Sequence, residues 1–139
     1  MAVNWNSQAL MARIRPAMMR GVVRWISAVD AESVRLIMSP PKTGKIYRRR
    51  SVKHQASAPG EAPANDTGRL VNSRRIDLFE ERLTGRLTYS TKYARHLHYG
   101  TEKMEPRPWL EPALQSQKEA GIDMIREEMR AVLGEGGKK

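Results

Sequence analysis

The chain has 139 residues, a length that suits one domain with a single core, and we treat residues 1–139 as that domain. Cysteine is absent, which excludes disulfides and cysteine-bound metal. The formal net charge of +10 predicts attraction to nucleic acid, to acidic lipid or to an acidic protein partner. No apolar run approaches the ~18 residues of a membrane span, and no signal peptide is recognisable, so we expect a protein that stays in the cytoplasm.

The first part of the chain predicts a long amphipathic helix, which Asn4 or Asn6 can cap. Its apolar residues recur at steps of three or four: Leu10, Met11, Ile14, Met18, Val22, Trp25 and Val29. Pro16 interrupts the pattern, so we expect either a bend there or a separate arm before it. Residues 32–38 continue or repeat the helix, and Pro40-Pro41 ends it. The opposite face, solvated or bound to a partner, carries Arg13, Arg15, Arg20 and Arg24.

A short strand at 45–49 and a long loop are predicted next. Residues 51–66 are rich in Ser, Ala, Pro, Gly and Asn and have almost no large apolar side chain. Such a segment cannot bury enough surface to fold alone, so we interpret it as a flexible loop that a partner orders. A short helix or turn follows at 68–72, with Asp66 or Thr67 as its cap.

Alternating apolar residues at 76–80 and at 82–90 predict two antiparallel strands. The turn that joins them falls either at Glu80-Glu81 or at Thr84-Gly85. Together with the short strand upstream, they predict a small sheet of two to four strands.

The sequence pattern of residues 93–114 changes three times, between helical, turn and proline-rich segments, and it predicts a stiff strap between two helices. The strap opens with a short helix, continues through a turn and two prolines, and carries a large aromatic side chain in its second half. Gly100 suits a helix end that needs positive φ, and Pro112 suits the first turn of the next helix. The residues that we assign to the strap are Tyr93, Tyr99, Gly100, Thr101, Arg107, Pro108, Trp109 and Leu110.

A last amphipathic helix is marked by Ala113, Leu114, Gly121, Met124, Ile125, Met129, Val132 and Leu133. Three glycines end it, so residues 134–139 are predicted to be a disordered basic tail. The order of elements predicts an α+β fold in which a small antiparallel sheet packs against a long N-terminal helix and a C-terminal helix, with one long flexible loop.

The sequence predicts no enzyme, no metal site and no cofactor. His96 and His98 are two residues apart on a helix, so they point to different sides and cannot share one metal, and His54 lies far along the chain. No serine sits in a nucleophile elbow, and the stretch PPKTGK lacks the spacing of a phosphate-binding loop.

Two basic runs are the candidate contacts with a polyanion: Arg48, Arg49, Arg50 and Lys53, then Arg74 and Arg75. Phosphate contacts from such runs give sequence-independent, salt-sensitive affinity. No motif of sequence-specific DNA or RNA recognition accompanies them. The alternative is that these arginines pair with acidic residues of another subunit.

Two stretches carry a resemblance to a known family. The strap supplies Tyr93, Ala94, Tyr99, Gly100, Thr101, Arg107, Pro108, Trp109, Leu110, Pro112, Ala113 and Leu114, and the upstream stretch is Ser57 to Ser73. In order and spacing they resemble the tail-component family of long-tailed bacteriophages typified by gene ten of a lambdoid coliphage, described as neck or tail-completion proteins. The chain departs from that pattern at His98, where an acidic residue is expected, at Arg95, where proline is common, and at Trp109, where phenylalanine is usual.

The resemblance implies a structural virion protein that forms a homo-oligomeric ring at the head–tail junction. Its partners would be other copies of itself, the head connector or adaptor, and the tail terminator or tube. Non-specific contact with the DNA that passes through would be a further possibility, and the protein would reside in the host cytoplasm before assembly. The loop residues expected to meet a neighbour are Ser57, Pro59, Gly60, Glu61, Pro63, Thr67 and Gly68. The alternative function is a small basic protein that binds DNA without sequence specificity.

Overall fold

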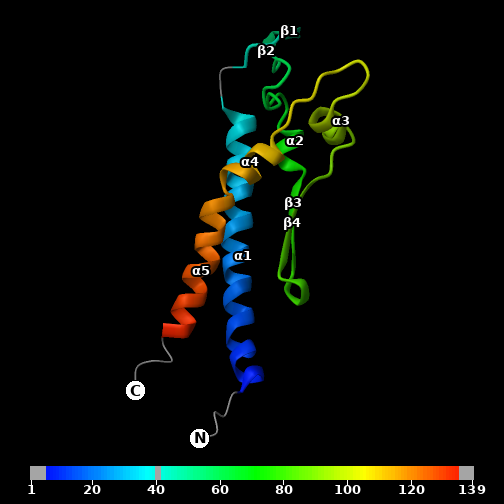
Figure 1. Cartoon of the computed structure of the whole chain (residues 1–139). Coiled ribbons are helices and arrows are strands. Elements are labelled where there is room, and N and C mark those ends of the chain that lie inside the picture. Colours follow the sequence, from blue (N-terminus) through cyan, green and yellow to red (C-terminus); the bar gives the residue numbers. More distant parts are fainter. Residues whose placement is uncertain (1–5, 40–41, 135–139) are drawn as a thin grey trace, which may run out of the picture.

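The computed structural model describes residues 6–39 and 42–134 and confirms the α+β fold (Figure 1). A long helix, α1 (Ser7–Met38), forms the axis of the molecule, and α5 (Lys118–Gly134) runs beside it. A β-hairpin lies on the other side of α1, and the irregular segments gather near the C-terminal end of α1. No helix among the described residues has the length and apolar character needed to cross a bilayer.

Helix α1 begins at the predicted cap. The Asn6 side chain accepts a hydrogen bond from the backbone N–H of Ala9 at 3.1 Å, which satisfies one of the free donors of the first turn. Asn4 and the pair Pro40-Pro41 lie outside the described residues. The helix continues through Pro16 for 32 residues, so the expectation of a separate arm is wrong.

The buried residues of α1 coincide only in part with the predicted stripe. They are Ala17, Gly21, Ile26, Val29, Ser33 and Ile37. Of the predicted stripe, Val29 is buried and Met11 is 45% exposed. Helices α1 and α5 approach closely at Gly21, where a Cβ would stand 2.5 Å from the Cα of Ile125.

The arginines predicted for the outer face of α1 are used within the chain. Arg20 pairs with Glu128 of α5 at 2.9 Å, and Arg24 pairs with Glu127 at 3.0 Å. Because Arg20, Arg24 and Glu127 are about half exposed to solvent, such pairs stabilise the fold only modestly.

Two separate two-stranded antiparallel sheets replace the single expected sheet. The first pairs β1 (Ile46–Arg49) with β2 (Val52–Gln55). The predicted loop at 51–66 is therefore wrong over its first part, because the backbone of β2 continues the hairpin although its side chains are mostly polar. The remainder, 56–66, is irregular.

The second sheet pairs β3 (Arg74–Phe79) with β4 (Thr84–Tyr89), as the alternation predicted. A 3₁₀ turn, η1 (Glu80–Arg82), joins them, so the turn falls at the first of the two predicted places. Strand β4 packs against α1, where a Cβ on Gly85 would stand 2.8 Å from Cδ1 of Ile26. Strand β3 lies farther from α1, and it leaves Ile76 and Leu78 exposed.

The short helix α2 (Arg69–Asn72) is present, but its predicted cap is wrong. Gly68 occupies the cap position with a φ of 76°, and no side chain caps the helix. Asp66 instead pairs with Arg49 at 3.3 Å.

The strap is built as predicted, from α3 (Ala94–Tyr99) through extended chain to α4 (Leu110–Ser116). Gly100 has a φ of 75°. The last helix comes in two pieces, because α4 ends at Ser116 and α5 starts at Lys118. Helix α5 includes Gly134, and the rest of the predicted tail lies outside the described residues.

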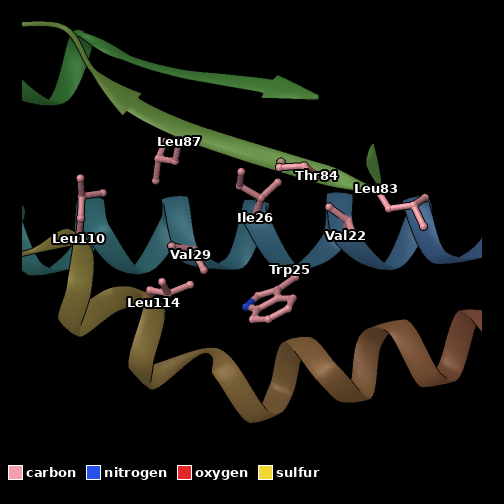
Figure 2. Close-up of a pocket in the computed structure, with 10 residues that line it drawn as sticks. Val22, Trp25, Ile26, Val29, Leu83, Thr84, Leu87, Leu110 and Leu114 are labelled. Carbon is pink, nitrogen blue, oxygen red and sulfur yellow. The ribbon is translucent and has the colours of Figure 1, made fainter. Parts of the chain in front are cut away.

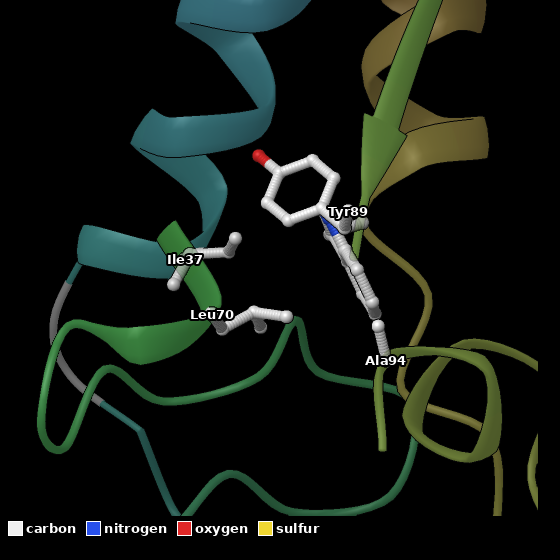
Figure 3. Packing of buried hydrophobic residues seen from close by; sticks show 5 residues of the cluster. Ile37, Leu70, Tyr89 and Ala94 are labelled. Atoms are coloured by element: carbon white, nitrogen blue, oxygen red, sulfur yellow. The ribbon is translucent and has the colours of Figure 1, made fainter. Parts of the chain in front are cut away.

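The main core lies where the strap crosses the C-terminal end of α1 (Figure 3). It joins Ile37, Leu70, Tyr89, Ala94 and Trp109, which come from five different parts of the chain. Trp109 is only 1% exposed, and its ring meets Tyr89 edge-on at 5.4 Å between centroids. The second half of the strap therefore contributes to the core through Trp109.

Candidate interaction surfaces

An apolar groove runs between β4, α1 and the start of the C-terminal helices, with a volume of about 410 Å³ (Figure 2). Helix α1 forms its floor, the β3–β4 hairpin forms one wall and α4 forms the other. The residues that line it are Val22, Trp25, Ile26, Val29, Leu83, Thr84, Gly85, Leu87, Leu110 and Leu114.

None of the ten residues that line the apolar groove is charged. Leu114 on its α4 wall is 47% exposed. On the hairpin, Ile76 and Leu78 pair with Leu87 and Gly85, and residues directly opposite each other in an antiparallel sheet share a face. The exposed side chains of β3 therefore stand on the same face of the hairpin as the groove wall. A contiguous apolar surface of this kind is typical of a contact with another protein.

Sequence patterns did not reveal this groove. Val22, Trp25 and Val29 belong to the predicted stripe and Leu114 to the predicted last helix, whereas Ile26 lies outside the predicted stripe. Sequence patterns do not predict the open space between the β3–β4 hairpin and α4. The two elements lie on either side of α1 and do not close over it, and no local pattern encodes their separation.

The strap residues are placed around the core cluster. Trp109 is buried, Arg107 and Pro108 are half-buried, and Arg107 donates its backbone N–H to Leu97 O at 2.7 Å. His98 stacks edge-on against Trp109 at 5.2 Å, and burial lowers the pKa of its imidazole. Tyr99 is 72% exposed, so a partner can reach it.

The loop residues predicted to meet a neighbour are divided between the interior and the surface. Ser57 is 3% exposed, and Pro63 is also buried. Pro59, Gly60 and Thr67 are exposed. The structure therefore leaves only part of the loop available for contact.

Glu61 holds the loop in place through its carboxylate. It accepts hydrogen bonds from the backbone N–H of Thr43 at 3.0 Å, from the Thr43 hydroxyl, and from the backbone N–H of Ala58 at 2.9 Å. The Thr43 hydroxyl bond is the largest cause, and the two backbone N–H bonds follow, of a Glu61 pKa lowered to about 2. Lys42, close by, adds a smaller effect in the same direction.

The two basic runs have different environments. Arg74 pairs with Asp30 of α1 at 3.0 Å, and Arg75 pairs with Asp77 at 3.0 Å. The charges of both arginines are therefore neutralised within the chain. The other run lies on the exposed β1–β2 hairpin. There Arg49 pairs with Asp66, whereas Arg48, Arg50 and Lys53 form no ion pair with any described residue.

Groups of three or more His, Asp or Glu that could hold a metal ion are absent from the described ranges 6–39 and 42–134. Comparisons of the chain with models of known protein families, with curated proteins and with solved structures found no match.

Proposed function

We propose that this chain is a structural protein of a long-tailed bacteriophage virion. In this proposal it forms a homo-oligomeric ring at the head–tail junction, as a neck or tail-completion protein, and joins the head connector to the tail terminator or tube. It is made in the host cytoplasm and is then assembled into the particle.

The observation that carries the proposal is the way the two stretches behind the family resemblance fit together. The upstream stretch supplies Leu70 and the strap supplies Trp109, and both belong to the same buried cluster. The backbone N–H of Gly60 also donates to Pro106 O at 3.0 Å. Residues that match the family pattern in two distant stretches are thus packed as one unit, which supports a shared fold over a chance match of short motifs.

The apolar groove supports the assembly role, and we propose that a second copy of this chain occupies it. Two copies with a formal net charge of +10 repel each other, so a contact between them needs an uncharged surface with apolar area to bury. The groove meets both conditions, since its ten lining residues carry no charge. A head-to-tail contact of this kind closes into a ring when the rotation between copies allows it.

The test is electron microscopy of lysates from a phage that carries a nonsense mutation in this gene. We expect DNA-filled heads and separate tails, and we expect purified protein to restore complete virions. Over-long tails would instead assign the protein to tail termination. Ordinary infectious particles from the mutant would contradict a structural role altogether.

A further inference from the structure

The β1–β2 hairpin has an unusual distribution of charge. Residues 42–55 contain six Lys or Arg and no Asp or Glu, so a tenth of the chain carries a large part of its excess positive charge. The hairpin lies beyond the C-terminal end of α1, at the end of the molecule opposite the start of that helix (Figure 1). All of its strand residues except His54 are exposed.

Its register brings like charges together. Arg48 lies directly opposite Lys53, and like charges at such positions destabilise a hairpin. At the tip, Arg50 has a φ of 56°, a left-handed conformation that glycine or asparagine adopts far more readily. Both features work against the isolated hairpin, and an anion bound between these cations relieves the first of them.

The hairpin cations that form no ion pair with a described residue lie on one face and at the tip. Arg48 and Lys53 stand on one face and Arg50 stands at the tip, whereas Arg49, on the other face, pairs with Asp66 at 3.3 Å. The phosphate backbone of duplex DNA offers closely spaced negative charges to such a face, and its major groove is wide enough to admit a two-stranded ribbon.

We infer that the β1–β2 hairpin is a DNA-binding ribbon, which contacts the phosphates of duplex DNA through Arg48, Lys53 and Arg50 without reading sequence. The ligand is a polyanion with closely spaced charges. The inference goes beyond the virion role and does not depend on it, because it concerns a ribbon of this chain and its affinity for DNA.

The experiment measures binding of the full chain to a short fluorescent duplex as salt is raised. The test variant combines Arg48→Gln, Arg50→Gln and Lys53→Gln, all at exposed positions. The control combines Lys92→Gln, Arg95→Gln and Lys103→Gln, which removes the same charge from exposed positions elsewhere. Circular dichroism establishes that both variants keep their helices.

We expect the slope of log K against log salt to fall by roughly 2.7 in the test variant, since each phosphate contact contributes about 0.9. Between about 50 and 200 mM salt, the wild type then loses roughly 40-fold more affinity than the test variant. The control keeps the wild-type slope.

Equal effects of the two variants would overturn the inference, because binding would then follow net charge alone. Wild-type affinity that does not respond to salt would overturn it as well. A labelled poly-glutamate that binds more tightly than the duplex, and loses that binding in the test variant, would assign the hairpin to an acidic protein partner. None of these three results affects the particle-assembly experiment, so the two proposals fail separately.

Discussion

At the scale of single residues, Trp109 is the largest fully buried side chain of the core. Its ring is 1% exposed and meets the rings of Tyr89 and His98. Replacing a buried tryptophan by alanine removes these contacts and leaves a cavity, so we expect Trp109→Ala to lower the free energy of unfolding by about 3–5 kcal/mol. Trp109→Phe retains an aromatic ring and should cost less. Urea denaturation measures both, and equal losses for the two variants would contradict a packing role.

Glu61 gives a prediction about pH. Its folded pKa of about 2 lies below the ordinary 4.5, so the stability that its ionised form contributes is present above pH 4.5 and is lost as the pH falls towards 2. A carbon NMR titration of the side-chain carboxyl should therefore show a midpoint near 2. Thr43→Val removes the hydroxyl that is the largest cause of the shift, so it should raise this midpoint. A wild-type midpoint near 4.5 would show that the loop is not held by this carboxylate.

At the scale of elements, the pairing of α1 with α5 depends on a close approach at Gly21. A Cβ there would meet the Cα of Ile125 at 2.5 Å, and because that atom belongs to the backbone, the helices would have to move apart. We expect Gly21→Ala to lower the free energy of unfolding by about 1–3 kcal/mol, although alanine favours helix over glycine by about 1 kcal/mol. Gly134→Ala is the matched control, since nothing lies within 4 Å of its added methyl. A stabilising Gly21→Ala in urea denaturation would contradict this packing.

Elements with a strong periodic pattern could be predicted from the sequence, and those set by packing could not. The β3–β4 hairpin follows its alternation, and Gly100 has the positive φ expected of a helix end. Strand β2 was missed because Val52–Gln55 is mostly polar and its pairing is made by the backbone. The buried face of α1 was missed in part because a search for large apolar residues passes over Ala17, Gly21 and Ser33, which let a neighbour come close.

The candidate surfaces could be predicted only as far as they depend on charge. The basic run at 48–53 was visible as a sequence, and the structure adds that Arg74 and Arg75 are paired within the chain. The apolar groove was not visible, since its lining residues have the same pattern as core residues. Whether such side chains are covered depends on the whole arrangement of α1, the β3–β4 hairpin and α4, which no single segment specifies.

At the scale of the whole molecule, the folded chain leaves an uncharged apolar groove open on a strongly basic protein. If a second copy occupies the groove, a charge placed in it must weaken self-association, because burying a carboxylate against apolar side chains is costly. Leu114→Glu places that charge on the groove wall at a position that is 47% exposed, so the monomer can fold with it. Leu133→Glu is a matched control, because Leu133 is 48% exposed, lies near the end of α5 and does not line the groove.

Sedimentation velocity over a range of protein concentrations measures the outcome. We expect the wild type and Leu133→Glu to form larger species as the concentration rises, and Leu114→Glu to remain a monomer at the concentrations where the others assemble. Both variants lower the net charge by the same amount, so a change in overall repulsion affects them equally. A loss of association in both variants would place the contact outside the groove, and a wild type that stays monomeric throughout would argue against any contact between copies of the free chain.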